Sequence, residues 1–134
     1  MAAIWVVAEQ NGDGSLARIS AEAATLARTL AEVAGGTAAG IVVAGAPGPA
    51  AKELAGYLPR VVAVTEPAAA GHAWATIAAE RASAVIGGDA HAVVIVGAGP
   101  DGRDVAGALS ALTGRGVLVN AIGAAWDGRL TVEM

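Results

Sequence analysis

Short apolar runs rich in β-branched residues recur along this chain of 134 residues, and each of the first four is followed by a stretch with helical spacing. The runs are apolar throughout instead of alternating with polar residues, so we expect strands that are covered on both faces. Strands that alternate with helices predict a parallel sheet joined by right-handed crossovers. The expected strands are 4–8, 39–43, 61–64, 92–96 and 117–119, and the expected helices are 20–33, 50–58, 73–86 and 103–113.

The carboxyl-terminal end departs from this alternation. Asp127-Gly128 is a two-residue hairpin signal, and residues 130–134 alternate between apolar and polar side chains. This pattern indicates an antiparallel strand at a sheet edge. The predicted fold is therefore α/β, a three-layer sandwich with a mostly parallel five-stranded sheet, helices on both faces and an antiparallel terminal edge strand. We find no long linker and no internal repeat, so residues 1–134 are expected to form one domain.

Composition excludes several classes of function. The chain has no cysteine, which rules out disulfides, thiolate metal sites and thiol catalysis and fits a reducing compartment. No apolar run approaches the ~20 residues that span a bilayer, and the start resembles neither a secretory signal nor a transit peptide. The formal charge of −4 is spread out, and the eight Lys and Arg residues form no cluster. We expect a cytoplasmic protein with no membrane and no nucleic-acid partner.

The sequence Gly97-Ala98-Gly99-Pro100-Asp101-Gly102 satisfies a dinucleotide-binding pattern of three spaced glycines, between an expected strand and an expected helix. Such glycines let backbone amides approach a phosphate at a helix amino terminus. However, the pattern follows the fourth strand, and Asp101 and Asp104 place negative charge where a pyrophosphate would lie. After the next expected strand, a dinucleotide-binding site would have an Asp or Glu that binds the ribose, but this chain has Asn120 there. A tight turn between strand and helix explains the glycines better.

Other polar and aromatic residues offer weaker signals. Glu9 and Gln10 lie where the first strand ends, the place where open α/β sheets hold ligands, although polar residues commonly follow a strand. His72 and His91 have no acid or second histidine at ligand spacing, so we expect no metal site.

The tryptophans and the serines are further candidates for a site. Trp5 and Trp74 fit core or partner-facing packing, whereas Trp126, beside the hairpin, is the tryptophan that we expect to be exposed. No serine lies in a nucleophile elbow, so no catalytic residue is predicted and the chain is not expected to be an enzyme.

Two separated blocks carry a family resemblance. The first reads Trp5-Val6-Val7-Ala8-Glu9-Gln10, Asp13-Gly14-Ser15-Leu16, Ser20-Ala21-Glu22 and Ala27-Arg28-Thr29-Leu30. The second, more specific block reads Gly97-Ala98-Gly99, Gly102-Arg103-Asp104-Val105-Ala106-Gly107, Leu109 and Gly114-Arg115-Gly116. Together they resemble the amino-terminal domain of the electron transfer flavoprotein α-subunit family over essentially the whole chain. Gly99, Gly107 and Asn120 depart from the family's usual Thr, Pro and Asp.

The resemblance implies a heterodimer of α and β subunits with one FAD, which takes electrons from flavin dehydrogenases to a quinone oxidoreductase or another acceptor. This domain would be scaffold and subunit interface. FAD would be held mainly by the family's carboxyl-terminal domain, which is absent from this chain, and AMP by the partner β subunit. No cofactor is expected on this chain alone, and the candidate nucleotide or interdomain contacts are Glu9, Gly97, Gly99, Gly102 and Arg103.

Two other readings remain open. One is a free-standing adenine-nucleotide module similar to universal stress proteins, with ligand held by Glu9, Gly45, Gly97 and Arg103. The other is a small nicotinamide-dependent reductase, which the missing ribose acid disfavours. The isolated chain is also expected to form a homodimer through the last strand or through the helix that contains Trp74, because unpaired strand edges recruit other strands.

Overall fold

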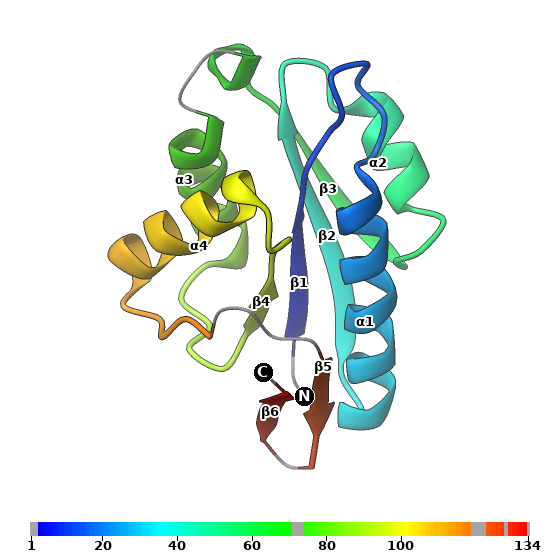
Figure 1. Cartoon of the computed structure of the whole chain (residues 1–134), viewed down its shortest axis with the longest axis vertical. Helices are drawn as coiled ribbons and strands as arrows, with labels where there is room; N and C mark the ends of the chain where they lie inside the picture. The colour runs from blue at the N-terminus through cyan, green and yellow to red at the C-terminus, as the bar shows by residue number, and fades with distance from the viewer. Residues whose placement is uncertain (1–2, 71–73, 119–122, 128, 134) are drawn as a thin grey trace.

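A parallel sheet of four strands forms the centre of the computed structural model (Figure 1). The structure describes residues 3–70, 74–118, 123–127 and 129–133. The strands lie in the order β3-β2-β1-β4, so the first strand pairs with both β2 and β4. Their bounds are β1 (Ala3–Ala8), β2 (Thr37–Ala44), β3 (Arg60–Thr65) and β4 (Val93–Ile95).

Helices cover both faces of this sheet, as the sequence predicts (Figure 1). One face packs against α1 (Arg18–Ala34) and α2 (Gly48–Leu54), and the other packs against α3 (Trp74–Ile86) and α4 (Pro100–Thr113). A short 3₁₀ helix, η1 (Pro67–Ala70), precedes α3. The molecule therefore has three layers, with the sheet in the middle.

Strand β1 shows why both faces are covered. Ile4, Val6 and Ala8 belong to the core beneath α1 and α2, whereas Trp5 and Val7 belong to the core beneath α3 and α4. Successive side chains of a strand point to opposite faces, so an unbroken apolar run needs a helical layer on each side. Residues 4–8 are all buried, which confirms the reading of this run as a central strand.

Helix ends follow the glycine and proline signals in the sequence. Gly35 ends α1 in the left-handed conformation with φ of 66°. Helix α4 begins at Pro100, one turn before the predicted start at Arg103, because proline suits the first turn of a helix. Ser20 is the first residue of the predicted helix 20–33 and for that reason a candidate amino-terminal cap; this prediction is wrong, because Ala17 precedes α1 and Ser20 lies inside it.

The predicted fifth parallel strand is not found where it was placed. Val117 and Leu118 form no strand and are 43% and 59% exposed, and Val119 lies outside the described residues. A fifth strand that continued the alternation beside β4 would meet a neighbour of only three residues. Such a short neighbour offers few ladder hydrogen bonds, so the described parallel sheet has four strands and not five.

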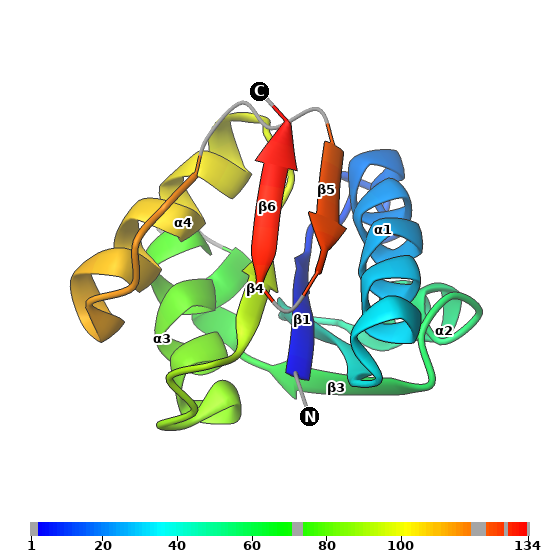
Figure 2. The same cartoon turned by 90° about the horizontal axis from the view of Figure 1, so that it is seen from below.

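The last strand is antiparallel, as predicted, but it does not lie at the edge of the main sheet. It is β6 (Leu130–Glu133), and it pairs with β5 (Gly123–Trp126) in a separate two-stranded sheet. Leu130 and Trp126 pack against the core that lies under α1, so Trp126 is partly buried and not exposed. Figure 2 shows β5 beside α1. This hairpin forms no strand pairing with the main sheet. It is positioned by the burial of its apolar side chains against the core under α1.

Candidate functional site

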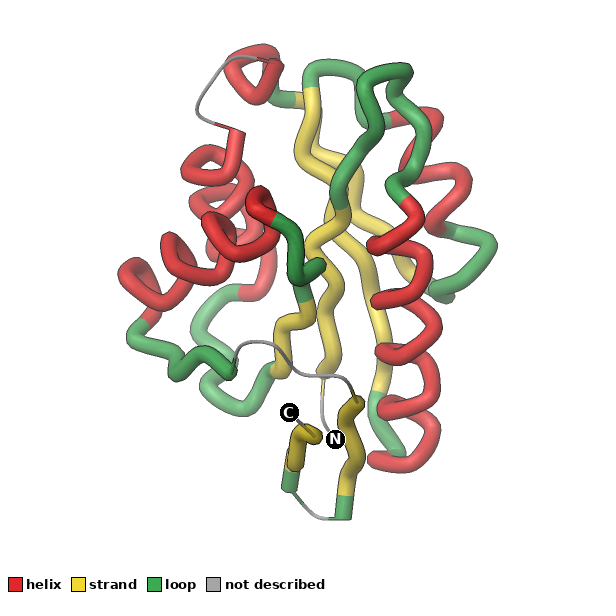
Figure 3. Tube along the Cα trace, in the orientation of Figure 1, coloured by secondary structure: helices red, strands yellow, loops and turns green. Residues whose placement is uncertain are grey.

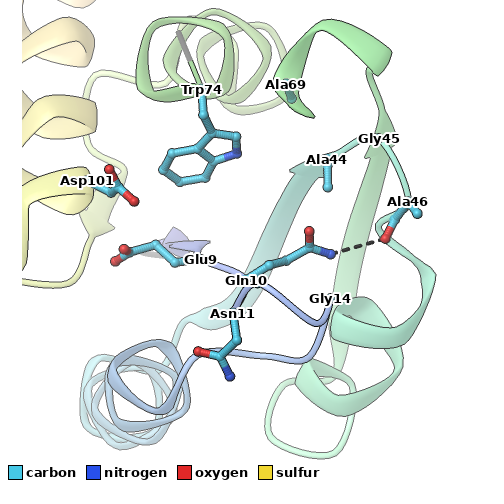
Figure 4. A pocket seen from close by; sticks show the side chains of 11 residues that line it. Glu9, Gln10, Asn11, Gly14, Ala44, Gly45, Ala46, Ala69, Trp74 and Asp101 are labelled. Atoms are coloured by element: carbon cyan, nitrogen blue, oxygen red, sulfur yellow. Dashed lines mark hydrogen bonds between the residues drawn. The ribbon is translucent and has the colours of Figure 1, made fainter. Parts of the chain in front are cut away.

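A cavity of about 380 Å³ lies at the carboxyl ends of β1 and β2 (Figure 4). Five segments line it: loop 9–14 after β1, residues 44–46 after β2, Ala69 of η1, Trp74 of α3 and Asp101 of α4. Figure 3 shows the loops after β1 and β2 at the end of the molecule away from the β5–β6 hairpin. After β1 the chain runs to α1 on one face of the sheet, and after β4 it runs to α4 on the other face. Open α/β sheets bind ligands where the connections of neighbouring strands diverge in this way.

Glu9 is the central acidic residue of the cavity, and two hydrogen bonds fix its backbone. Its N–H donates to Oγ of Ser20 at 2.8 Å, and its carbonyl accepts from the N–H of Ala17 at 2.9 Å. Ser20 is only 1% exposed. The sequence reasoning missed this role of Ser20, although a polar residue on the buried stripe of an apolar helix is a signal that could have indicated it.

The carboxyl group of Glu9 lies in an unfavourable environment. Its Oε2 is buried and has no hydrogen-bond partner among the described residues. Burial, and then the negative charge of Asp101, raise the pKa of Glu9 above its ordinary value. Both effects disfavour the charged form, because a buried charge loses water and a nearby like charge repels it. The two carboxyl groups lie at the same end of the cavity in Figure 4.

Trp74 and Gln10 are two further polar side chains in the wall of the cavity. The indole Nε1–H of Trp74 donates to the carbonyl O of Val43 at 2.8 Å, which fixes the ring beside the cavity (Figure 4). The Nε2 of Gln10 donates to the carbonyl O of Ala46 at 3.1 Å and so links the loops after β1 and β2. The sequence predicts that Trp74 packs in the core or against a partner. In the structure it is partly buried against the core beneath α3 and α4, and it also lines the cavity.

The glycine-rich turn after β4 is filled by the chain itself. A Cβ placed on Gly102 would overlap the carbonyl O of Gly97 and lie 2.7 Å from its carbonyl carbon. A Cβ placed on Gly97 would lie 2.7 Å from Oε2 of Glu9 and 2.9 Å from Ile19. These contacts mean that Gly97 and Gly102 allow α4 and Glu9 to pack against the turn. Gly99 has open space around it.

The structure brings only some of the predicted site residues together. Glu9 lines the cavity, as does Gly45 from the nucleotide-module reading, and Gly97 lies behind Glu9. Arg103 is exposed and borders a separate hollow with Ala98 and Asp104, and its Nε donates to the carbonyl O of Ala98 at 3.1 Å.

The chemistry of the cavity is acidic. Glu9 and Asp101 are its charged lining residues, and the described lining contains neither lysine nor arginine. Anionic phosphate would be repelled there, whereas a hydrogen-bond donor would be accepted. Within the described ranges, no group of three His, Asp or Glu side chains could hold a metal ion. His91 is exposed, and His72 lies outside the described residues. None of the described helices is both long and apolar enough to cross a bilayer.

Comparison with protein families adds the decisive observation. Residues 4–134 match the electron transfer flavoprotein domain. The chain belongs to this family. The match confirms the resemblance found in the two sequence blocks, and it identifies the protein as part of a family of electron carriers. No curated protein matches the chain.

Proposed function

We propose that this chain is the scaffold and subunit-interface domain of an electron transfer flavoprotein of α type. In this role it supports electron transfer from flavin dehydrogenases through FAD to a quinone oxidoreductase or another acceptor, in the cytoplasm, without catalytic residues of its own. The observation that carries the proposal is the family match, which extends over residues 4–134.

The packing of the glycine-rich turn supports a scaffold role. A side chain at Gly97 or Gly102 would collide with Glu9, Ile19 or the backbone of the turn, so close packing within the domain accounts for both glycines without a cofactor phosphate. FAD is then held mainly by the family's flavin-binding domain, and AMP by the partner β subunit. This domain supplies a surface and a fixed geometry, while the flavin carries the redox chemistry.

Arg103 is the residue that we assign to the contact with the β subunit or with the flavin-binding domain. It is exposed near the amino end of α4. A positive charge at this end interacts unfavourably with the helix dipole, at a cost of ~0.3–1 kcal/mol. Its bond to Ala98 holds the guanidinium at the rim of the second hollow. An interfacial role gives a reason for a positive charge at this end of the helix.

Calorimetric titration with the β subunit encoded in the same genome tests the proposal. We expect a complex of equal stoichiometry, and we expect Arg103→Ala to weaken it by about tenfold because an interfacial charged pair commonly contributes ~1.5 kcal/mol or more. The matched control is Arg28→Ala, which removes an exposed arginine from α1 on the other face. Absence of binding by the unsubstituted chain would contradict the function, and equal effects of both substitutions would contradict the role of Arg103.

A further inference from the structure

Strand β3 lies at an edge of the main sheet, and one side of its backbone has no neighbouring strand. Its one neighbour in the described sheet is β2, and Figure 2 shows β3 at the margin of the molecule. The N–H of Glu66 donates to the carbonyl O of Ala44 at 2.8 Å, and Ala44 pairs with Thr65. In a parallel ladder every second residue bonds to the neighbouring strand. The N–H and C=O groups of Val61, Ala63 and Thr65 therefore point away from β2, out of the sheet edge.

This edge lacks the devices that commonly keep edge strands from pairing. All six residues of β3 pair with β2 in one continuous register, without a bulge, and the strand contains neither lysine nor proline. Natural edges are often protected by bulges, prolines or charges within the strand. The side chains of Ala63 and Thr65 are exposed. A further extended segment can therefore add to the sheet at β3.

The prolines that flank β3 are placed symmetrically about Ala63, and they select one register for self-pairing. When Ala63 faces Ala63 of a second, antiparallel copy, Val61 faces Thr65, so every outward residue has an outward partner. A slip by two residues would set Pro59 or Pro67 opposite an outward residue, and proline has no N–H to donate. A slip by one residue would set outward groups against groups that already bond to β2.

The same register brings opposite charges together. Arg60 and Glu66 lie at the two ends of the paired segment, so each faces the other residue of the second copy. Both lie on the α3 side of the sheet: the Arg60 guanidinium is 5.5 Å from the ring centroid of Trp5, and Glu66 accepts from Arg81 of α3 at 2.7 Å. Complementary charges at both ends of an interface favour one register and one orientation.

We propose that two copies of this chain pair through β3, antiparallel and about a twofold axis at Ala63, so that their four-stranded sheets form one continuous sheet. Val61, Ala63 and Thr65 exchange backbone hydrogen bonds with the second copy, and Arg60 of each copy pairs with Glu66 of the other. This interface is isologous and closed, so it produces a dimer and not a fibre. The strands β3 and β4 lie at opposite ends of the strand order, and the pairing does not rest on the proposed function.

Cysteine crosslinking tests the register, because the chain has no cysteine of its own. The Cα atoms of the two Ala63 residues would be ~5.5 Å apart, a separation that a disulfide can span. Thr65→Cys is the matched control: it is exposed on the same strand, but the register places its two thiols ~13 Å apart along the strands. Under mild oxidation we expect Ala63→Cys to form a linked dimer at least about tenfold faster than Thr65→Cys. Equal rates, or no linked dimer with either variant, overturn the proposal.

Sedimentation equilibrium measures the strength of the dimer without a crosslink. The unsubstituted chain should dimerise reversibly, and Ala63→Lys should weaken the dimer at least about tenfold because it sets two like charges opposite each other at the axis. Ala111→Lys, at an exposed alanine of α4, is the control that should change nothing. A strict monomer, or a dimer that Ala63→Lys leaves unchanged, overturns the proposal. Self-association through β6 would give that second result, since it does not use the β3 edge. Ala63→Lys should bind the β subunit as the unsubstituted chain does, so failure of the proposed function leaves this test intact.

Discussion

Substitution of Gly102 tests how α4 is attached to the sheet. In Gly102→Ala the new methyl group would overlap the carbonyl O of Gly97 and lie 2.7 Å from the carbonyl carbon. These are backbone atoms, so a side-chain rotation cannot relieve the overlap. The amino end of α4 has to move away from the end of β4, and the packing of the buried Val105 against the core moves with it.

The expected loss of stability is about 1–3 kcal/mol, the usual cost of overpacking a well-packed site. The gain in helix propensity from glycine to alanine, at most ~1 kcal/mol, offsets part of this cost. Gly107→Ala is the matched control because it lies on the same helix and its Cβ would meet no atom within 4 Å. That substitution should stabilise the protein by ~0.5–1 kcal/mol. The two changes are chemically identical and should have opposite signs.

Urea denaturation followed by circular dichroism measures both variants against the unsubstituted chain. The free energy of unfolding should fall in Gly102→Ala and rise in Gly107→Ala, with slopes that stay similar. If Gly102→Ala is as stable as Gly107→Ala, the close contact between Gly97 and Gly102 does not exist, and the explanation of the glycine-rich turn is refuted.

Three further predictions follow from the cavity and the hairpin. Burial and the charge of Asp101 raise the folded-state pKa of Glu9 above its ordinary value of 4.5, so the free energy of unfolding should fall as the pH rises from below that value through the raised pKa. The stability that Glu9→Gln gains over the unsubstituted chain should therefore be larger at neutral pH than in acid. An equal gain at all pH values would contradict this prediction. Trp74→Phe removes the hydrogen bond from the indole N–H to Val43 and should lower the free energy of unfolding by about 1 kcal/mol. Thermal or urea unfolding measures this loss, and an unchanged value would contradict the presence of that bond. Light scattering over a wide concentration range should show self-association of the isolated chain that Val132→Lys reduces, and a strict monomer at all concentrations would refute the role of β6.

The central part of the fold could be predicted from the sequence because its signal is local. Residues 4–8, 39–43 and 61–64 are short apolar runs whose neighbours on both faces are helices, and each lies within an observed strand. Helix α1 also ends close to the predicted end at residue 33, where Gly35 takes up the left-handed conformation that is easiest for glycine. These features depend on nearby residues and hardly on the rest of the chain.

The carboxyl-terminal part could not be predicted in the same way. Val117 and Leu118 have the composition of a strand, but strand formation needs a partner, and the short β4 offers few bonds on its outer edge. Similarly, residues 130–133 alternate as a strand should, yet the sequence does not reveal that β5 is the partner. The partner of a strand depends on the tertiary structure and not on the local sequence. The prediction of an antiparallel terminal strand was therefore right, whereas its placement at the edge of the main sheet was wrong.

The candidate site was only partly visible in the sequence. Glu9 could be identified because it directly follows a central strand. Trp74 and Asp101 could not be joined to it, since they come from α3 and α4 and meet Glu9 only through the folding of the chain. Gly97 and Gly102 matched a phosphate-binding pattern, whereas their contacts give them a packing role, because the same small residues serve both purposes.

Sedimentation velocity of the chain with its cognate β subunit and FAD, recorded at both the protein and the flavin absorption bands, tests the central claim most directly. The account predicts that the chain alone sediments without flavin absorbance and moves, in the mixture, into a faster boundary together with the β subunit. A chain whose boundary is unchanged by the β subunit, or one that carries stoichiometric flavin by itself, would contradict its assignment as a scaffold and interface domain.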